Sequence, residues 1–516
     1  MPQAPGIATQ ALLSVLALGL LLAFQTPALR RRRRLAGAAS AILALASVAA
    51  WFGFGRLHGP DVAVPGHRFV HYYEQFHYQL GSRYFPELGY DGLYAASLAA
   101  ERESFPDRIQ PPRTRDLRTN RVVPTRHLDD HAERVRERFR PERWRAFVRD
   151  HEVFLAMNPP AQVERWRLDL GYNPTPAWTF AARLLNAHLP LSHRRLEWLG
   201  AVDLLLLAIA FAAVFRSYGP AVGAASLVIF GLGYPGRFTW VGGAYLRQDW
   251  LAAAMLALCA LRRGRPAAAG LLIGYATAVR LFPALLLLGP AVAALGDLRR
   301  GEPPRWALRL AAGFAAALAL AGVAGSLAGR GPAAWSEFAS RIELYRASGA
   351  RNLIGAELPV LFGGEIARRA FGAEPQERWD LQVEDVVLRR QLRWPWLALV
   401  QGLLFGLLVA AAWRATPAAA AALSLVAIFA LAPAAGYYWA ALALVPLRAR
   451  GGSALAALLA ANLAMCGAHA LTADTLVVYG LVSAILGVFF VGWLLPDALR
   501  SAREWAAPLV RGQAPG

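Results

Sequence analysis

The residues best suited to chemistry lie in one aromatic segment, Phe69–Tyr94, which follows directly on an apolar stretch. Its sequence, FVHYYEQFHYQLGSRYFPELGYDGLY, combines tyrosine and histidine with acidic residues. The acids are Glu74, Glu87 and Asp91, and Asp61 lies a little earlier in the chain. A carboxylate in this segment could take the proton of an attacking hydroxyl as a general base.

A helix through this segment would bring several of these side chains onto one face, because residues three or four apart are neighbours on a helix. The residues on that face would be His71, Glu74, Gln75 and Tyr78. The alternative is an amphipathic helix that lies at the membrane surface and uses its tyrosine and histidine residues as ordinary anchors. Both interpretations place the segment beside a membrane.

A second candidate is Arg280, an ionisable residue inside an apolar run. The stretch GLLIGYATAVRLFPALLLLGP is interrupted only by Arg280 and Pro283. A charged residue within a membrane segment indicates a functional role by default, and arginine is well suited to two-point contact with a phosphate. The alternative is an arginine at a helix end that extends toward the membrane surface.

The composition is that of a polytopic membrane protein, and we expect an all-α fold. Of the 516 residues, 56% are hydrophobic and 17% are charged, and the mean hydropathy is +0.35, outside the range of ordinary soluble domains. The net charge of +20 comes from arginine, since the sequence has no lysine. Arginine collects in the short inner loops of membrane proteins. No basic stripe accompanies a soluble fold, so we expect no nucleic-acid partner.

About thirteen apolar segments are predicted to cross the membrane. They cover residues 7–29, 36–54, 198–215, 219–234, 249–261, 266–281, 282–296, 306–328, 393–413, 416–434, 436–447, 453–471 and 474–496. Several are shorter than the roughly 20 residues that a perpendicular helix needs, as is known where broken helices line a cavity. Arginines after alternate spans fall on one side, which predicts an outer N-terminus and an inner C-terminus.

This topology divides the chain into five parts. They are 1–54 (two transmembrane helices), 55–197 (a long outer, periplasmic loop region with interfacial helices), 198–328 (transmembrane helices), 329–392 (a second outer loop) and 393–516 (C-terminal transmembrane helices and an inside tail). Arg280, Gln248, Asp249, Tyr437 and Tyr438 are all expected near the outer face. The plain alternatives are a helix-capping aspartate and an aromatic belt of tyrosines.

Other motifs give little support for a metal or a nucleotide. His127 and His131 have a spacing that could hold a metal, but a solvated helix face explains it better. No P-loop or HExxH motif is present. Cys259 and Cys466 lie in apolar spans and form no CxxC pair. We therefore predict no metal site and no cofactor.

Three stretches together resemble a known family. They are an early outer segment of the form YY…G…Y (Tyr72, Tyr73, Gly81, Tyr84), an R/K-x-x-P element (Arg280, Pro283) and a late P…YY…P helix (Pro433, Tyr437, Tyr438, Pro446). This combination resembles the GT-C superfamily of membrane glycosyltransferases that use polyprenyl-phosphate sugars. It is most similar to the bacterial branch of alpha-mannosyltransferases.

The resemblance implies an enzyme of the bacterial inner (plasma) membrane. It would move a sugar from a polyprenyl-phosphate-sugar donor to a hydroxyl of a glycan or lipid acceptor by inverting attack, with Arg280 stabilising the leaving phosphate. The family's usual aspartate before the first tyrosine pair is replaced here by His67, Arg68 and His71. Glu74 or Asp91 would therefore act as the base. The other pocket candidates are His71, Tyr72, Tyr73, Gln248, Asp249, Tyr437 and Tyr438.

Two other functions are compatible with the sequence. One is a transporter or flippase-like handler of lipid-linked glycans, although transporters commonly show inverted repeats and no internal repeat is visible here. The other is a non-catalytic assembly protein of the cell envelope. For such a protein, replacing Arg280 or Glu74 by alanine would leave activity in the cell intact.

Overall fold

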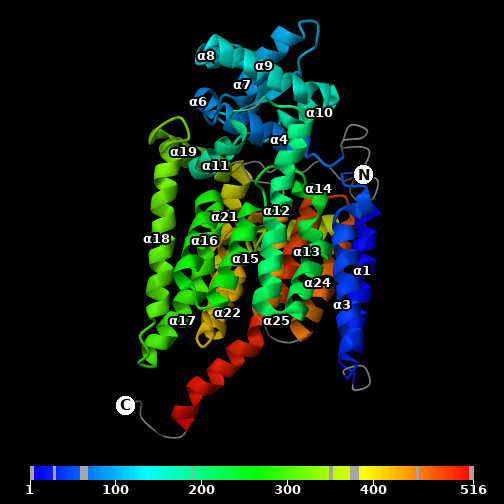
Figure 1. Cartoon of the computed structure of the whole chain (residues 1–516), viewed down its shortest axis with the longest axis vertical. Coiled ribbons are helices and arrows are strands. Elements are labelled where there is room, and N and C mark those ends of the chain that lie inside the picture. The colour runs from blue at the N-terminus through cyan, green and yellow to red at the C-terminus, as the bar shows by residue number, and fades with distance from the viewer. Residues whose placement is uncertain are drawn as a thin grey trace.

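The chain forms a bundle of apolar helices with a cap of shorter helices over one end of it (Figure 1). The computed structural model describes residues 5–26, 31–58, 68–188, 190–347, 352–371, 383–448 and 452–510. Asp61 and His67 therefore lie outside the described residues. The predicted all-α, polytopic membrane fold is confirmed.

Eight helices in the described part of the chain are long and apolar enough to cross a membrane. They are α1 (Pro5–Ala23), α3 (Arg33–Trp51), α12 (His193–Tyr218), η5 with α17 (Phe282–Leu287 and Leu288–Arg299), α18 (Arg305–Ser326), α21 (Val383–Ala412), α24 (Gly452–Leu471) and α25 (Thr475–Val510). The α1 helix begins at the cap end, and α25 extends past the opposite end (Figure 1).

The other five predicted spans are helical but short or broken. They are α13 (Pro220–Leu232) followed by η4 (Tyr234–Gly236) and α14 (Phe238–Val241), α15 (Asp249–Arg262), α16 (Pro266–Arg280), α22 with α23 (Pro417–Leu423 and Leu425–Leu431) and η6 (Gly436–Arg448). The α13–α14 pair bends by 70° and raises the count of possible spans to nine at most among the described residues. The 14 residues of α15 rise only about 21 Å, less than the roughly 30 Å of a bilayer core.

The cap is built from residues 68–188 together with α19 (Ala333–Ala347). Its elements are α4 (Tyr72–Gln75), η2 (Phe76–Leu80), α5 (Gly81–Arg83), α6 (Phe85–Leu88), α7 (Leu93–Ser104), β1 (Arg113–Asp116), β2 (Arg121–Pro124), η3 (Thr125–Leu128), α8 (Asp129–Glu137), α9 (Pro141–Ala156), α10 (Pro160–Trp166) and α11 (Pro176–Asn186). Strands β1 and β2 pair antiparallel. Phe76, Phe154 and Trp166 pack together in the cap interior.

The cap buries the aromatic segment instead of leaving it on a membrane surface. Glu74, Gln75, His77 and Tyr78 are all buried, which does not fit the alternative that the tyrosine and histidine side chains anchor an amphipathic helix in a membrane surface. The helix turns of α4 and α5 are joined by a five-residue π-helical stretch, η2, and π-turns inside helices are frequent at functional sites. The remaining elements are η1 (Gly53–Gly55), α20 (Glu357–Phe371) and a ribbon of β3 (Leu353–Ile354) with β4 (Ala434–Ala435).

Small residues allow the bundle helices near the site to approach closely. A Cβ at Gly270 of α16 would lie 2.0 Å from the backbone oxygen of Leu310 in α18, and one at Gly313 would lie 2.1 Å from that of Ala267. Small residues at such contacts are the usual way for membrane helices to gain van der Waals packing. This contact fixes α16, and with it the position of Arg280 at its end.

Candidate functional site

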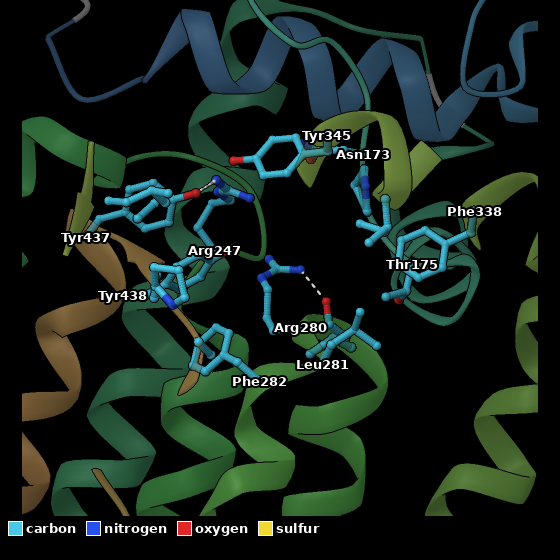
Figure 2. A pocket seen from close by; sticks show the side chains of 18 of the residues that line it. Asn173, Thr175, Arg247, Arg280, Leu281, Phe282, Phe338, Tyr345, Tyr437 and Tyr438 are labelled. Atoms are coloured by element: carbon cyan, nitrogen blue, oxygen red, sulfur yellow. Dashed lines mark hydrogen bonds between the residues drawn. The ribbon is translucent and has the colours of Figure 1, made fainter. Parts of the chain in front are cut away.

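A cavity of about 190 Å³ lies where the cap meets the bundle. We call it the cap–bundle cavity; its lining includes Tyr78, Asn173, Thr175, Arg247, Arg280, Leu281, Phe282, Phe338, Ile342, Tyr345, Tyr437 and Tyr438. The lining comes from η2, the approaches to α11 and α15, the end of α16, the start of η5, α19, β3, β4 with the residues before it, and η6. Figure 2 shows the side chains of Arg247 and Arg280 directed into the same space.

Arg247 is held by one carboxylate and two tyrosine rings. Its Nε lies 2.9 Å from the Glu74 Oε2, and its Nη2 donates to the Tyr437 hydroxyl at 2.6 Å. The guanidinium also lies over the rings of Tyr78 and Tyr437, at 4.3 Å and 5.0 Å from their centroids. The backbone N–H of Arg247 donates to Asp203 Oδ2 at 2.7 Å. These contacts fix a buried cation at the wall of the cavity.

Arg280 is held mainly by backbone carbonyls. Its Nη1 donates to the oxygen of Val279 at 2.8 Å, and its Nη2 donates to that of Leu246 at 2.7 Å. The nearest carboxylate oxygen, Asp249 Oδ1, is 3.7 Å away. Tyr275 donates to the other oxygen of Asp249 at 3.0 Å. Arg280 thus keeps much of its charge available to a ligand in the cavity.

Strained backbone supports both arginines. Leu246 and Leu281 have φ of 49° and 59°, in the left-handed region that costs a residue with a Cβ about 1–2 kcal/mol. Leu246 precedes Arg247 and turns its carbonyl toward Arg280 and toward Trp178 Nε1, which donates at 2.9 Å. Leu281 ends α16 directly after Arg280. Such strain is retained at ligand-binding and catalytic sites, where the surrounding structure enforces it.

The structure brings together many of the predicted site residues. Arg280, Tyr437 and Tyr438 line the cavity. The Tyr438 ring packs against Trp250 and Phe282, with centroids 5.7 Å and 4.9 Å away. Gln248 and Asp249 are buried at the start of α15 and are not among the cavity-lining residues. Glu74 does not line the cavity itself but reaches it through its pairing with Arg247.

Three other predicted residues, His71, Tyr72 and Tyr73, do not line the cavity but make contacts that hold the aromatic segment in place. His71 caps α4 by accepting from the Glu74 N–H at 3.2 Å. Burial, followed by the charge of Arg247, lowers the pKa of His71 to about 4, so this ring is neutral at pH 7 and can accept. The Tyr72 hydroxyl lies 2.6 Å from His193 Nδ1. Burial raises the pKa of Tyr73, and Asp169 raises it further through its charge and a hydrogen bond.

Asp91 faces away from this site. Its Oδ2 lies 3.6 Å from His131 Nε2 and its Oδ1 lies 3.6 Å from Arg138, both in or next to α8. It is not among the cavity-lining residues. Glu87 likewise pairs with Arg143 at 2.7 Å. Of the three acids of the aromatic segment, Glu74 is therefore the one connected to the cavity.

Some cavity-lining residues were not among the predicted site residues. Arg247 directly precedes the predicted Gln248 and Asp249, in the polar triplet that opens the apolar span from residue 249. Thr175 caps α11 and donates to the Ala278 oxygen at 2.6 Å, which joins the cap to α16. On α19, Phe338, Ile342 and Tyr345 follow a helical repeat that would have indicated one shared face.

The chemistry of the cavity suits an anionic group next to apolar surface. Burial raises the pKa of Glu74, although the neighbouring Arg247 opposes that rise. Within the described ranges, no three histidine, cysteine or acidic side chains are grouped so that they could hold a metal ion. No protein-family model, curated protein or solved structure matches the chain. The geometry of the cavity is therefore the basis for assigning a function.

Proposed function

We propose that the protein is a membrane glycosyltransferase of GT-C type that takes its sugar from a polyprenyl-phosphate donor. The observation that carries the proposal is the pair Arg247 and Arg280 facing one cavity, with Glu74 attached to the first. Arginine binds phosphate through several donors at once. The aromatic rings of Phe282, Phe338 and other lining residues give the apolar surface that a lipid chain needs.

The size of the cavity favours a head group over a whole lipid. Its volume of about 190 Å³ is below the roughly 300–1,000 Å³ of typical small-molecule pockets. A phosphate with part of a sugar fits such a space. Leu281, which lines the cavity and is 46% exposed, marks the side from which an isoprenoid chain would extend into the lipid.

The proposed reaction is an inverting displacement at the anomeric carbon of the sugar. The acceptor hydroxyl oxygen forms a bond to that carbon, and the bond from the carbon to the phosphate oxygen breaks. The electron pair leaves with the polyprenyl phosphate, where Arg247 and Arg280 stabilise the growing negative charge. The hydroxyl proton passes to the Glu74 carboxylate, as general base.

The proposal places the cap on the outer, periplasmic side of a bacterial inner membrane. The thirteen predicted spans, with the short α15, α16, α22–α23 and η6 crossing in pairs, would then put the N-terminus outside and the C-terminus inside. Arginine-rich turns support this orientation, because Arg262, Arg263 and Arg265 lie in the α15–α16 turn, at the end of these helices remote from Arg280.

Reconstituted proteoliposomes test the proposed function. The protein is incubated with a radiolabelled polyprenyl-phosphate hexose and a panel of glycan and glycolipid acceptors, and free polyprenyl phosphate and glycosylated product are counted. The orientation of the protein in the liposome membrane is determined by labelling Ile109→Cys with an impermeant maleimide. Ile109 is 94% exposed in the cap, and both native cysteines are buried.

We expect Glu74→Ala to lower turnover by about 10²- to 10⁴-fold, the usual contribution of a general base. Asp91→Ala should retain turnover, because its carboxylate points toward α8. Wild-type turnover in the Glu74 variant would refute the role of this base. Movement of the intact donor across the membrane without cleavage would instead indicate a transporter.

A further inference from the structure

Glu74 and a phosphate ligand have the same partner in this fold. The Glu74 carboxylate lies 2.9 Å from Arg247, whose side chain is only 4% exposed. Arg247 also lines the cap–bundle cavity, whereas Glu74 lies behind it. A second anion that enters the cavity therefore meets a guanidinium already paired with an acid of the cap.

The two arginines of the cavity differ in this respect. Arg280 gives two of its N–H groups to carbonyl oxygens, which carry no net charge, and its acid Asp249 is 3.7 Å away. Arg247 has a close carboxylate partner instead. An approaching phosphate would gain attraction from Arg280 directly, but it would have to weaken an existing ion pair to gain the same from Arg247.

We infer that Arg247 is a phosphate-binding residue for which Glu74 competes, so that binding of the phosphate frees the Glu74 carboxylate. This inference rests on the proposed function for its ligand class, a lipid monophosphate. The Tyr437 hydroxyl and the Tyr78 ring hold the guanidinium in place by their own contacts. Arg247 can therefore keep its position while its anionic partner changes.

The exchange would prepare Glu74 for its chemical step. A buried carboxylate that loses its cation holds a proton more strongly, because desolvation then acts without opposition. A change of side-chain rotamer would turn the freed group toward the cavity. The base would thus become effective only when the donor phosphate is in place, which protects the site from proton transfer without a donor.

A binding experiment separates this inference from the catalytic proposal. The probe is farnesyl phosphate, a short isoprenyl monophosphate, titrated by calorimetry into the detergent-purified full chain, with farnesol as the uncharged control. The variants are Glu74→Gln, Arg247→Gln and the double variant. Glu87→Gln is the matched control, since it removes a cap carboxylate that pairs with Arg143 at 2.7 Å, away from the cavity.

We expect Glu74→Gln to bind farnesyl phosphate about tenfold more tightly than the wild type, which corresponds to about 1.4 kcal/mol. Arg247→Gln should bind more weakly, and in its background the effect of Glu74→Gln should disappear, as a double-mutant cycle requires for coupled residues. Glu87→Gln and all farnesol titrations should show no change. Glu74→Asp keeps the charge but reaches one methylene less far, so it should give a smaller gain.

Two results would overturn the inference. Unchanged or weaker phosphate binding in folded Glu74→Gln and Glu74→Asp would mean that Glu74 does not compete for Arg247. If Glu74→Gln still tightens farnesyl phosphate binding in the Arg247→Gln background, the gain comes from removing a negative charge near the cavity and not from competition for Arg247. If the predicted gain occurs but no acceptor receives sugar in the transfer assay, the competition stands and the glycosyltransferase function fails.

Discussion

Replacement of Arg280 by glutamine is the most direct test of a phosphate site in the cavity. The wild-type side chain is 5% exposed and ends at the cavity, with two N–H groups fixed by the Val279 and Leu246 carbonyls. Glutamine retains a polar end but loses the charge and the reach. We therefore expect weaker binding of farnesyl phosphate and little change for farnesol.

The size of the effect follows from the contacts that are lost. A hydrogen bond to a charged group contributes about 1.5–3 kcal/mol, which corresponds to about 10- to 150-fold in affinity. Arg280→Lys should fall between the wild type and Arg280→Gln, because lysine keeps the charge but cannot reproduce the planar fork of donors. Isothermal calorimetry on the purified full chain measures all three affinities.

Folding must be separated from binding in this test, because Arg280 also faces the buried Asp249 at 3.7 Å. A thermal melt of each variant shows whether the loss of this cation destabilises the protein. Arg143→Gln is the matched control, since it breaks an arginine–carboxylate pair in the cap, outside the cavity. Wild-type affinity for farnesyl phosphate in folded Arg280→Gln would refute the phosphate role of Arg280.

Two further predictions concern acidity and packing. Burial raises the pKa of Glu74, and the protonated acid cannot act as a base. The rate of sugar transfer should therefore fall on acidification, with a midpoint above the ordinary glutamate pKa of about 4.3. A midpoint at or below that value would contradict this role of Glu74. Gly313→Ala should destabilise the protein by about 1–3 kcal/mol through overpacking, because its Cβ would lie 2.1 Å from a backbone oxygen. Gly322→Ala in the same helix meets nothing within 4 Å and should melt no lower than the wild type.

Arg280 could be found from sequence because a charge inside an apolar run is costly and therefore conspicuous. Arg247 is less conspicuous, because it stands in the polar triplet Arg247–Asp249 just before an apolar span, where a helix cap or interfacial contacts are ordinary explanations. The chain also gives no local reason to prefer Glu74 over Asp91. The two acids can be told apart only in the folded cap, which places Asp91 next to His131 and Arg138.

Hydropathy and helix length give different counts of spans, because apolar character and length are different properties. Residues 249–261 and 266–281 are apolar throughout most of their length, but α15 and α16 have only 14 and 15 residues. Small residues of α16 pack closely against α18. Hydropathy therefore located these helices correctly, whereas which surfaces they reach depends on tertiary packing.

The short lengths of α15 and α16 also explain why the charges of Asp249 and Arg280 lie together beneath the cap. They are joined by a tight turn at Gly264, with φ of 69°, so the start of one helix lies beside the end of the other. Asp249 in the first turn of α15 and Arg280 in the last turn of α16 each complement the helix dipole. Because both helices are shorter than a bilayer core, this charged end lies recessed beneath the cap. The lengths of these two helices thus determine where Arg280 meets the cap–bundle cavity.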